Sequence, residues 1–193
     1  MLNSAINLKL TTLGCIPMAK GDTFFLRARI DIAAASTAYN SDSIDISAYT
    51  NPSEGRVLVV DRGFVTFTGD GPAPLTEDDV ETGSAASRAC MTQALSEVQT
   101  DLVSVGNNNA VFMENTLYCA TNDTAFTMMD QMQSLNPIEY TGGFIIPTDQ
   151  IFVGAKVDAA WNGAIKVNYL FEVHTEKLSL RRIQELLVSL TAN

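Results

Sequence analysis

The sequence is poor in cysteine, in positive charge and in long apolar runs. Its three cysteines, Cys15, Cys90 and Cys119, are too few and too scattered for a disulfide framework or a close-spaced zinc site. We expect them to be buried as small hydrophobic residues. No apolar run approaches the roughly 20 residues that a membrane-spanning helix requires. The N-terminus MLNSAINLKL lacks the pattern of a signal peptide, so we expect no secretion by that route.

The shortage of positive charge limits the possible partners. Twelve basic residues stand against twenty-two acidic ones, which gives a net charge of −10. Direct nucleic-acid binding is not expected, because it needs clustered Lys and Arg to displace counterions from phosphates. The nearest approach to a cluster is Arg181-Arg182. The acidity is explained by solubility, by adaptation to salty water, or by an exposed shell surface on which like charges discourage nonspecific association.

Catalytic side chains are also scarce. The one histidine, His174, stands near the end of a predicted strand with Glu172 and Glu176 beside it. A lone histidine of this kind is far more often a satisfied edge or surface residue than a catalytic base. We assign no catalytic, cofactor-binding or metal-binding residue, and we expect neither an enzyme activity nor a cofactor.

The acidic segment GDGPAPLTEDDVETG, residues 69–83, is the other candidate for a site. Its carboxylates Asp78, Asp79 and Glu81 could offer oxygen ligands to calcium, but they lack the ligand order of an EF-hand loop. Its GDG lacks the Lys and the Ser or Thr of a phosphate-binding loop. The segment is therefore predicted to be a solvated surface loop without regular structure.

Strand-like alternation dominates the rest of the chain and is strongest over residues 144–174. Asn162-Gly163 is typical of a hairpin turn, because both residues tolerate a positive φ. A three-residue loop, Trp161-Asn162-Gly163, gives a register in which every apolar residue faces another, and it sets Asp158 opposite Lys166. The predicted pairs join Ile151, Val153, Ala155, Val157 and Ala159 to Val173, Phe171, Tyr169, Val167 and Ile165, respectively.

Two further elements are predicted between residues 56 and 105. Residues 57–60 and 64–67 flank Asp61-Arg62-Gly63, which predicts a second hairpin with a three-residue loop. After the acidic segment, apolar residues recur at spacings of four and three, which indicates an amphipathic helix from about Ala85 to Ser104. This helical stripe consists of Met91, Leu95, Val98, Leu102 and Val105.

The remaining elements are strands, apart from a final helix. Strands are predicted over residues 2–16, 24–32 and 111–119, with a short one near Ile44; residues 126–135 are ambiguous between strand and helix. Gly142-Gly143 is predicted to be a bend or bulge. Ser179 can cap a C-terminal helix that packs on the sandwich or docks on a neighbouring subunit. Its apolar stripe is Ile183, Leu186, Leu187 and Leu190.

About eight strands, one internal helix and a short C-terminal helix predict a mainly β protein. We expect an antiparallel β-sandwich, a single jelly roll, formed as one domain over residues 1–193. The segments PTDQIFVGAKV and IKVNYLFEVHTEKLS resemble the closing strands and tail helix of jelly-roll capsid proteins from tailless icosahedral viruses. The resemblance covers about a quarter of the chain. It implies self-assembly, with copies of itself and other capsid subunits as partners, and no catalytic residues.

The resemblance also implies a location in the virion, after assembly in the host cytoplasm, and a possible apposition to an internal virion membrane without spanning it. The chain departs from RNA-packaging capsid proteins in lacking a basic N-terminal arm, so we expect it not to grip the genome. The first hypothesis is a virion shell subunit. The second is a β-sandwich that binds carbohydrate or a surface ligand through Tyr39, Tyr49 and Trp161. The third hypothesis, which the sequence supports least, is an enzyme that uses His174 and a nearby carboxylate.

Overall fold

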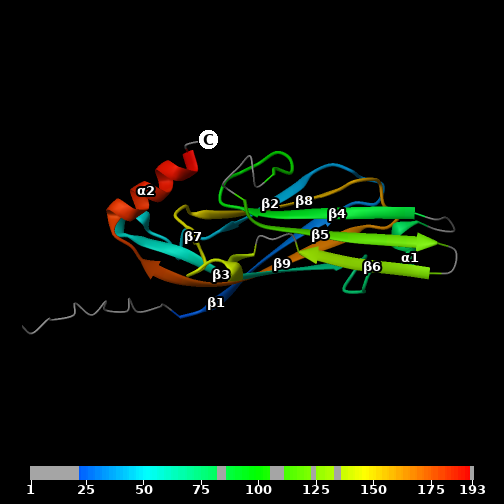
Figure 1. Cartoon of the computed structure of the whole chain (residues 1–193), viewed down its shortest axis with the longest axis horizontal. Helices are drawn as coiled ribbons and strands as arrows, with labels where there is room; N and C mark the ends of the chain where they lie inside the picture. Colours follow the sequence, from blue (N-terminus) through cyan, green and yellow to red (C-terminus); the bar gives the residue numbers. More distant parts are fainter. Residues whose placement is uncertain (1–21, 82–85, 105–110, 123–124, 133–135, 192–193) are drawn as a thin grey trace, which may run out of the picture.

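Two antiparallel sheets pack face to face in the structure, which is a computed structural model (Figure 1). It describes residues 22–81, 86–104, 111–122, 125–132 and 136–191. The sheets are built from β1 (Phe24–Ile32), β2 (Asn40–Asp45), β3 (Arg56–Thr68), β4 (Ala86–Leu95), β5 (Val111–Asn122), β6 (Ala125–Met132), β7 (Phe144–Ile146), β8 (Gln150–Val157) and β9 (Ile165–Lys177). The helices are α1 (Glu77–Val80) and α2 (Leu180–Thr191), with single 3-10 turns η1 (Pro52–Glu54) and η2 (Pro137–Glu139).

The strand order defines a jelly roll. One sheet, sheet A, has the order β1-β9-β3-β7, and the other, sheet B, has the order β2-β8-β4-β5-β6. With β6 set aside, the chain pairs β1 with β9, β2 with β8, β3 with β7 and β4 with β5. This pairing of early strands with late ones is a long antiparallel ribbon wound into two sheets, as in a jelly roll. The predicted fold class is confirmed, and β6 is an additional strand at the edge of sheet B.

The hairpin predicted over residues 144–174 is wrong in its pairing. Strand β8 belongs to sheet B and pairs with β2 and β4, whereas β9 belongs to sheet A and pairs with β1 and β3. The alternation itself is right, because the apolar residues of both strands are buried in the shared core. The buried side chains of β8 and β9 face each other across the space between the two sheets, and the two strands are not hydrogen-bonded neighbours in one sheet. The predicted Asp158–Lys166 pair is also wrong: Asp158 accepts a hydrogen bond from the backbone N–H of Ala89, and Lys166 pairs with Asp70.

The connection between β8 and β9 crosses from one sheet to the other and is hydrogen-bonded to α1. The backbone N–H of Gly163 donates to the carbonyl of Asp79 at 2.9 Å, and the side-chain amide of Asn162 donates to the carbonyl of Asp78 at 2.8 Å. Gly163 does not adopt a positive φ. It is required for space, since a Cβ there would lie 2.9 Å from the Cα of Asp79. Asn-Gly thus marks a close approach of two segments and not a hairpin turn.

The second predicted hairpin is wrong as well, because residues 56–68 form the single strand β3. Its register with β9 shifts between Val60 and Arg62, so Asp61 is the extra residue of a β-bulge. Gly63 continues the strand, and its N–H and carbonyl both bond to the side-chain amide of Asn136. A bulge and a glycine within one strand give the same sequence signal as a short turn.

The amphipathic helix predicted from Ala85 to Ser104 is a strand, β4, followed by irregular chain. Strand β4 is internal to sheet B, between β8 and β5, and residues 92–95 are all buried. The core covers one side of it. On the other side Gln93 bonds to Tyr39, to the carbonyl of Asp101 and to the N–H of Val103. A strand covered on both faces loses the alternation that would have identified it.

Several predicted elements are confirmed. Strand β1 buries alternate residues, as its pattern indicated, and β5 and β2 form where strands were expected. Of the ambiguous residues 126–135, those up to Met132 belong to the strand β6, and residues 133–135 lie outside the described residues. The N–H of Arg182 bonds to the Ser179 hydroxyl at 3.3 Å, which confirms the cap of α2. The strand predicted over residues 2–16 lies outside the described residues.

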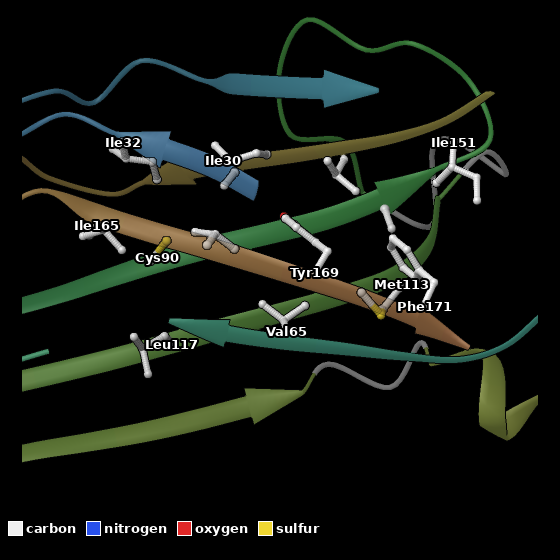
Figure 2. Close-up of a cluster of buried hydrophobic side chains, with 14 of the residues drawn as sticks. Ile30, Ile32, Val65, Cys90, Met113, Leu117, Ile151, Ile165, Tyr169 and Phe171 are labelled. Carbon is white, nitrogen blue, oxygen red and sulfur yellow. The ribbon is translucent and has the colours of Figure 1, made fainter. Parts of the chain in front are cut away.

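The core fills the space between the sheets (Figure 2). The Tyr169 hydroxyl crosses it and donates to the carbonyl of Gly154 at 2.8 Å, which joins sheet A to sheet B. Cys90 and Cys119 lie in this core, as predicted; Cys15 is outside the described residues. None of the helices in the described residues has both the length and the apolar character needed to cross a membrane.

Candidate functional site

The outward surface of sheet A carries exposed aromatic and charged side chains in adjacent rows. The register places Arg27, Leu170 and Phe64 in one row and Phe25, Glu172 and Arg62 in the next. We call these six residues the open face. Phe25 is 51% exposed and Phe64 is 43% exposed. The two phenylalanines lie diagonally across β9, one in each row, and both present large apolar side chains to the surface.

The open face is partly ordered by its own ion pair. Arg62 Nε lies 3.4 Å from Glu172 Oε2, and both side chains are at least one-quarter exposed. An exposed pair of this kind contributes little to stability. Its arrangement still matters, because Arg and aromatic residues are enriched at the centres of protein interfaces. The geometry is suited to contact with another protein surface.

The sequence identified the part of this surface that β1 contributes. The alternation of FFLRARIDIA placed Phe25 and Arg27 on the side away from the core, where the structure has them. It missed Phe64, because residues 57–67 were interpreted as a hairpin and not as one strand. The signal that could have found Phe64 is its alternation with the buried Gly63 and Val65.

His174 lies close to the open face but is buried. It is only 5% exposed, and its Nδ1 lies 2.7 Å from Asp61 Oδ2. The prediction of a satisfied histidine is confirmed, but its surface or edge position is wrong, and its partner is neither Glu172 nor Glu176. The bulge at Asp61 brings this carboxylate to the ring, which no sequence spacing revealed.

Neither described cysteine is placed or charged to act as a nucleophile. Burial raises the pKa of Cys90 to about 12, with smaller contributions from Cys119 and Asp158. Burial also raises the pKa of Cys119 to about 11. The thiolate is the reactive form of cysteine, so both residues are inert at neutral pH. The geometry gives them a packing role in the core.

The acidic segment has structural partners. The carboxylate of Asp79 accepts hydrogen bonds from the N–H and the hydroxyl of Thr76, which forms the capping box of α1. Glu81 pairs with Arg88 at 2.6 Å. The prediction that this segment has no regular structure is therefore wrong at the single turn of α1. Within the described ranges, no group of three His, Cys, Asp or Glu side chains is arranged to hold a metal ion.

The three aromatics considered for carbohydrate binding do not form a platform. Trp161 is only 2% exposed, the Tyr39 hydroxyl accepts a hydrogen bond from Gln93, and Tyr49 packs against Phe24 with ring centroids 4.6 Å apart. A sugar-binding surface needs exposed rings that face one ligand. The structure does not bring these three together in that way.

No protein-family model matches the chain. No curated protein matches it either.

Solved structures of viral proteins do resemble it, at low identity. The unassembled VP1 pentamer of KI polyomavirus matches with a TM-score of 0.43 and 7% identity, over 81% of this chain and 95% of that one. The unassembled VP1 pentamer of Merkel cell polyomavirus matches with a TM-score of 0.40 and 7% identity, over 83% and 99%. Desmodium yellow mottle tymovirus matches with a TM-score of 0.32 and 10% identity, over 82% and 90%. The fold of this chain is assigned from its own strand order.

Proposed function

We propose that the chain is a viral capsid subunit that assembles with copies of itself into an icosahedral shell. The observation that supports this most is the open face on a jelly roll. Two exposed phenylalanines lie beside two arginines on the outward surface of a four-stranded sheet. A sheet surface of this composition fits contact with a second protein better than it fits a small ligand.

The energetics favour burial of this surface in an assembly. Complete burial of a Phe side chain is worth about 1.5 to 3 kcal/mol. Two such residues from each of two subunits supply a useful fraction of the free energy of association, because a few anchoring side chains dominate most interfaces. Arg62 and Glu172 would then supply orientation more than affinity.

The proposal includes the setting of the protein. As a shell subunit it would reside in the virion, after assembly in the host cytoplasm, and would contact other capsid subunits. Its net charge of −10 supports a subunit that does not bind the genome directly. A shell built around an internal membrane would place it next to lipid without a membrane-spanning segment.

Light scattering coupled to size exclusion, followed by negative-stain imaging, tests this proposal. The full chain is expected to form capsomers, rings or shells as concentration rises. Phe64→Asp and Phe25→Asp should each weaken assembly at least tenfold, because each places a carboxylate within the buried contact. Ser41→Asp, an equal charge change at an exposed position of β2, is the matched control and should assemble normally. A monomer at every concentration and salt condition would refute the proposal.

A further inference from the structure

A groove of about 440 Å³ lies between β7 and α2. Phe144, Ile145 and Pro147 form one wall, and Leu186 forms much of the other. Leu186 is half-buried, while the next residue, Leu187, is 37% exposed and does not line the groove. The groove therefore has apolar walls contributed by two different elements.

Strand β7 is a short edge strand. It has three residues and pairs with β3 on one side, and no strand in the described part of the chain pairs with its other side. An unpaired edge can accept an extended segment through backbone hydrogen bonds, with alternate side chains entering adjacent pockets. Sheet A could gain a fifth strand here, as sheet B has at β6.

We propose that residues 2–16 of the same chain occupy this groove as an added strand on β7. Their sequence, LNSAINLKLTTLGCI, has the alternation of a strand, with Ile6, Leu8 and Leu10 on one side. One apolar side faces the groove, and the polar residues between them face solvent. The inference does not depend on the capsid proposal.

The register of sheet A brings the segment close to the groove. Phe24, where β1 begins, pairs with Val173; Val173 pairs with Val60, and Val60 pairs with Phe144. These four residues form one row across the sheet, so a strand added beyond β7 would lie four strand spacings, about 19 Å, from Phe24. About six extended residues cover that distance, at roughly 3.3 Å each. The tether between Ile16 and Phe24 is long enough, and it keeps the segment at high effective concentration near the groove.

Charge favours the same docking. Residues 1–21 contain Lys9 and Lys20 and no acidic residue. The other ten basic and all twenty-two acidic residues give residues 22–193 a charge of 10 − 22 = −12. Burial raises the pKa of the Tyr140 hydroxyl in the groove wall, and the nearby carboxylates of Glu139 and Glu114 raise it further. Arg182, which lines the opposite wall, is paired with Glu185.

Disulfide trapping in the full chain tests the proposal, because the segment already contains Cys15. In the variant Ser189→Cys the new thiol stands at the groove, and mild oxidation is expected to join it to Cys15 within one chain. Peptide mapping and a non-reducing gel identify the product. Ser41→Cys, at an exposed position on the far edge of sheet B, is the control. Its yield should be at least tenfold lower. A disulfide that joins two chains would overturn the proposal in favour of a second copy as the source of the segment.

Limited trypsin digestion gives an independent readout, since Lys9 lies within the segment. Leu186→Asp should speed cleavage after Lys9 about tenfold by releasing the segment from the groove. Leu187→Asp, a neighbouring change outside the groove, should leave the rate unchanged. Equal rates in the two variants, together with no intrachain disulfide, would show that the groove is not occupied by this segment. Circular dichroism of both variants shows whether each is folded.

Discussion

Tyr169 links the two sheets through a single hydroxyl. It is almost fully buried, and this burial raises its pKa well above the usual value, so the hydroxyl stays protonated and donates to the Gly154 carbonyl. The hydroxyl therefore joins the two sheets, and without it the buried Gly154 carbonyl would lose this hydrogen-bond donor.

Tyr169→Phe should lower the free energy of unfolding by about 1 kcal/mol, the net worth of one such hydrogen bond. Urea denaturation monitored by fluorescence measures the change. Tyr118→Phe is the control, because that ring is 38% exposed on the outside of sheet B. Equal stability of Tyr169→Phe and the wild type would mean that the bond contributes nothing.

The core cysteines give a prediction that depends on pH. With pKa values of about 12 for Cys90 and about 11 for Cys119, the thiolate fraction at pH 8 is roughly one in ten thousand and one in a thousand. Native alkylation should therefore be negligible at pH 8, and any slow labelling of Cys119 should rise about tenfold per pH unit. Peptide mass spectrometry measures it, with labelling in guanidinium as the reference. Rapid native labelling of Cys90 would contradict the buried placement.

At the residue scale the sequence predicted chemistry better than environment. It indicated that the His174 ring has a polar partner and that Cys90 and Cys119 pack in the interior. It could not predict that Asp61 reaches His174, because a bulge shifts one residue out of the ladder without altering the composition around it.

At the element scale, prediction succeeded where one face of an element is exposed. Strand β1 has alternating burial and α2 has a capping serine, and both were found with nearly their observed bounds. Strand β4 was missed because both of its faces are covered. The predicted pairing of β8 with β9 was wrong because alternation shows which face of a strand is buried but does not show which strand lies next to it.

The turn before β7 offers a matched pair of glycines. Gly142 and Gly143 both have positive φ, at 87° and 75°. A Cβ on Gly142 would meet nothing within 4 Å, whereas one on Gly143 would lie 2.6 Å from the Val60 carbonyl oxygen. Gly142→Ala should cost about 1 kcal/mol from backbone strain alone. Gly143→Ala should cost about 3 kcal/mol, since the backbone of β3 must also move.

Thermal or urea unfolding of the two variants measures this difference, and each serves as the control for the other. Similar losses in both would show that β7 is not held as closely to β3 as the structure has it.

At the scale of the whole molecule, net charge opposes assembly. Each subunit carries −10, so copies repel one another beyond their contact surface. Raising NaCl from 50 to 500 mM shortens the screening length from about 14 Å to about 4 Å. Self-association should therefore strengthen several-fold with salt, as measured by sedimentation velocity. Weaker association at high salt would indicate that ion pairs between subunits, and not the apolar part of the open face, dominate the contact.

The strand order also has a consequence for synthesis on the ribosome. Strand β9 lies between β1 and β3, and β8 lies between β2 and β4. Each of the first four strands to emerge therefore lacks one neighbour until late in translation, and Phe24 must wait for Val173. Neither sheet can be completed until nearly all of the chain has left the exit tunnel. The nascent chain should rely on late, nearly simultaneous closure of both layers, and such dominance of long-range pairing is typical of slow folding.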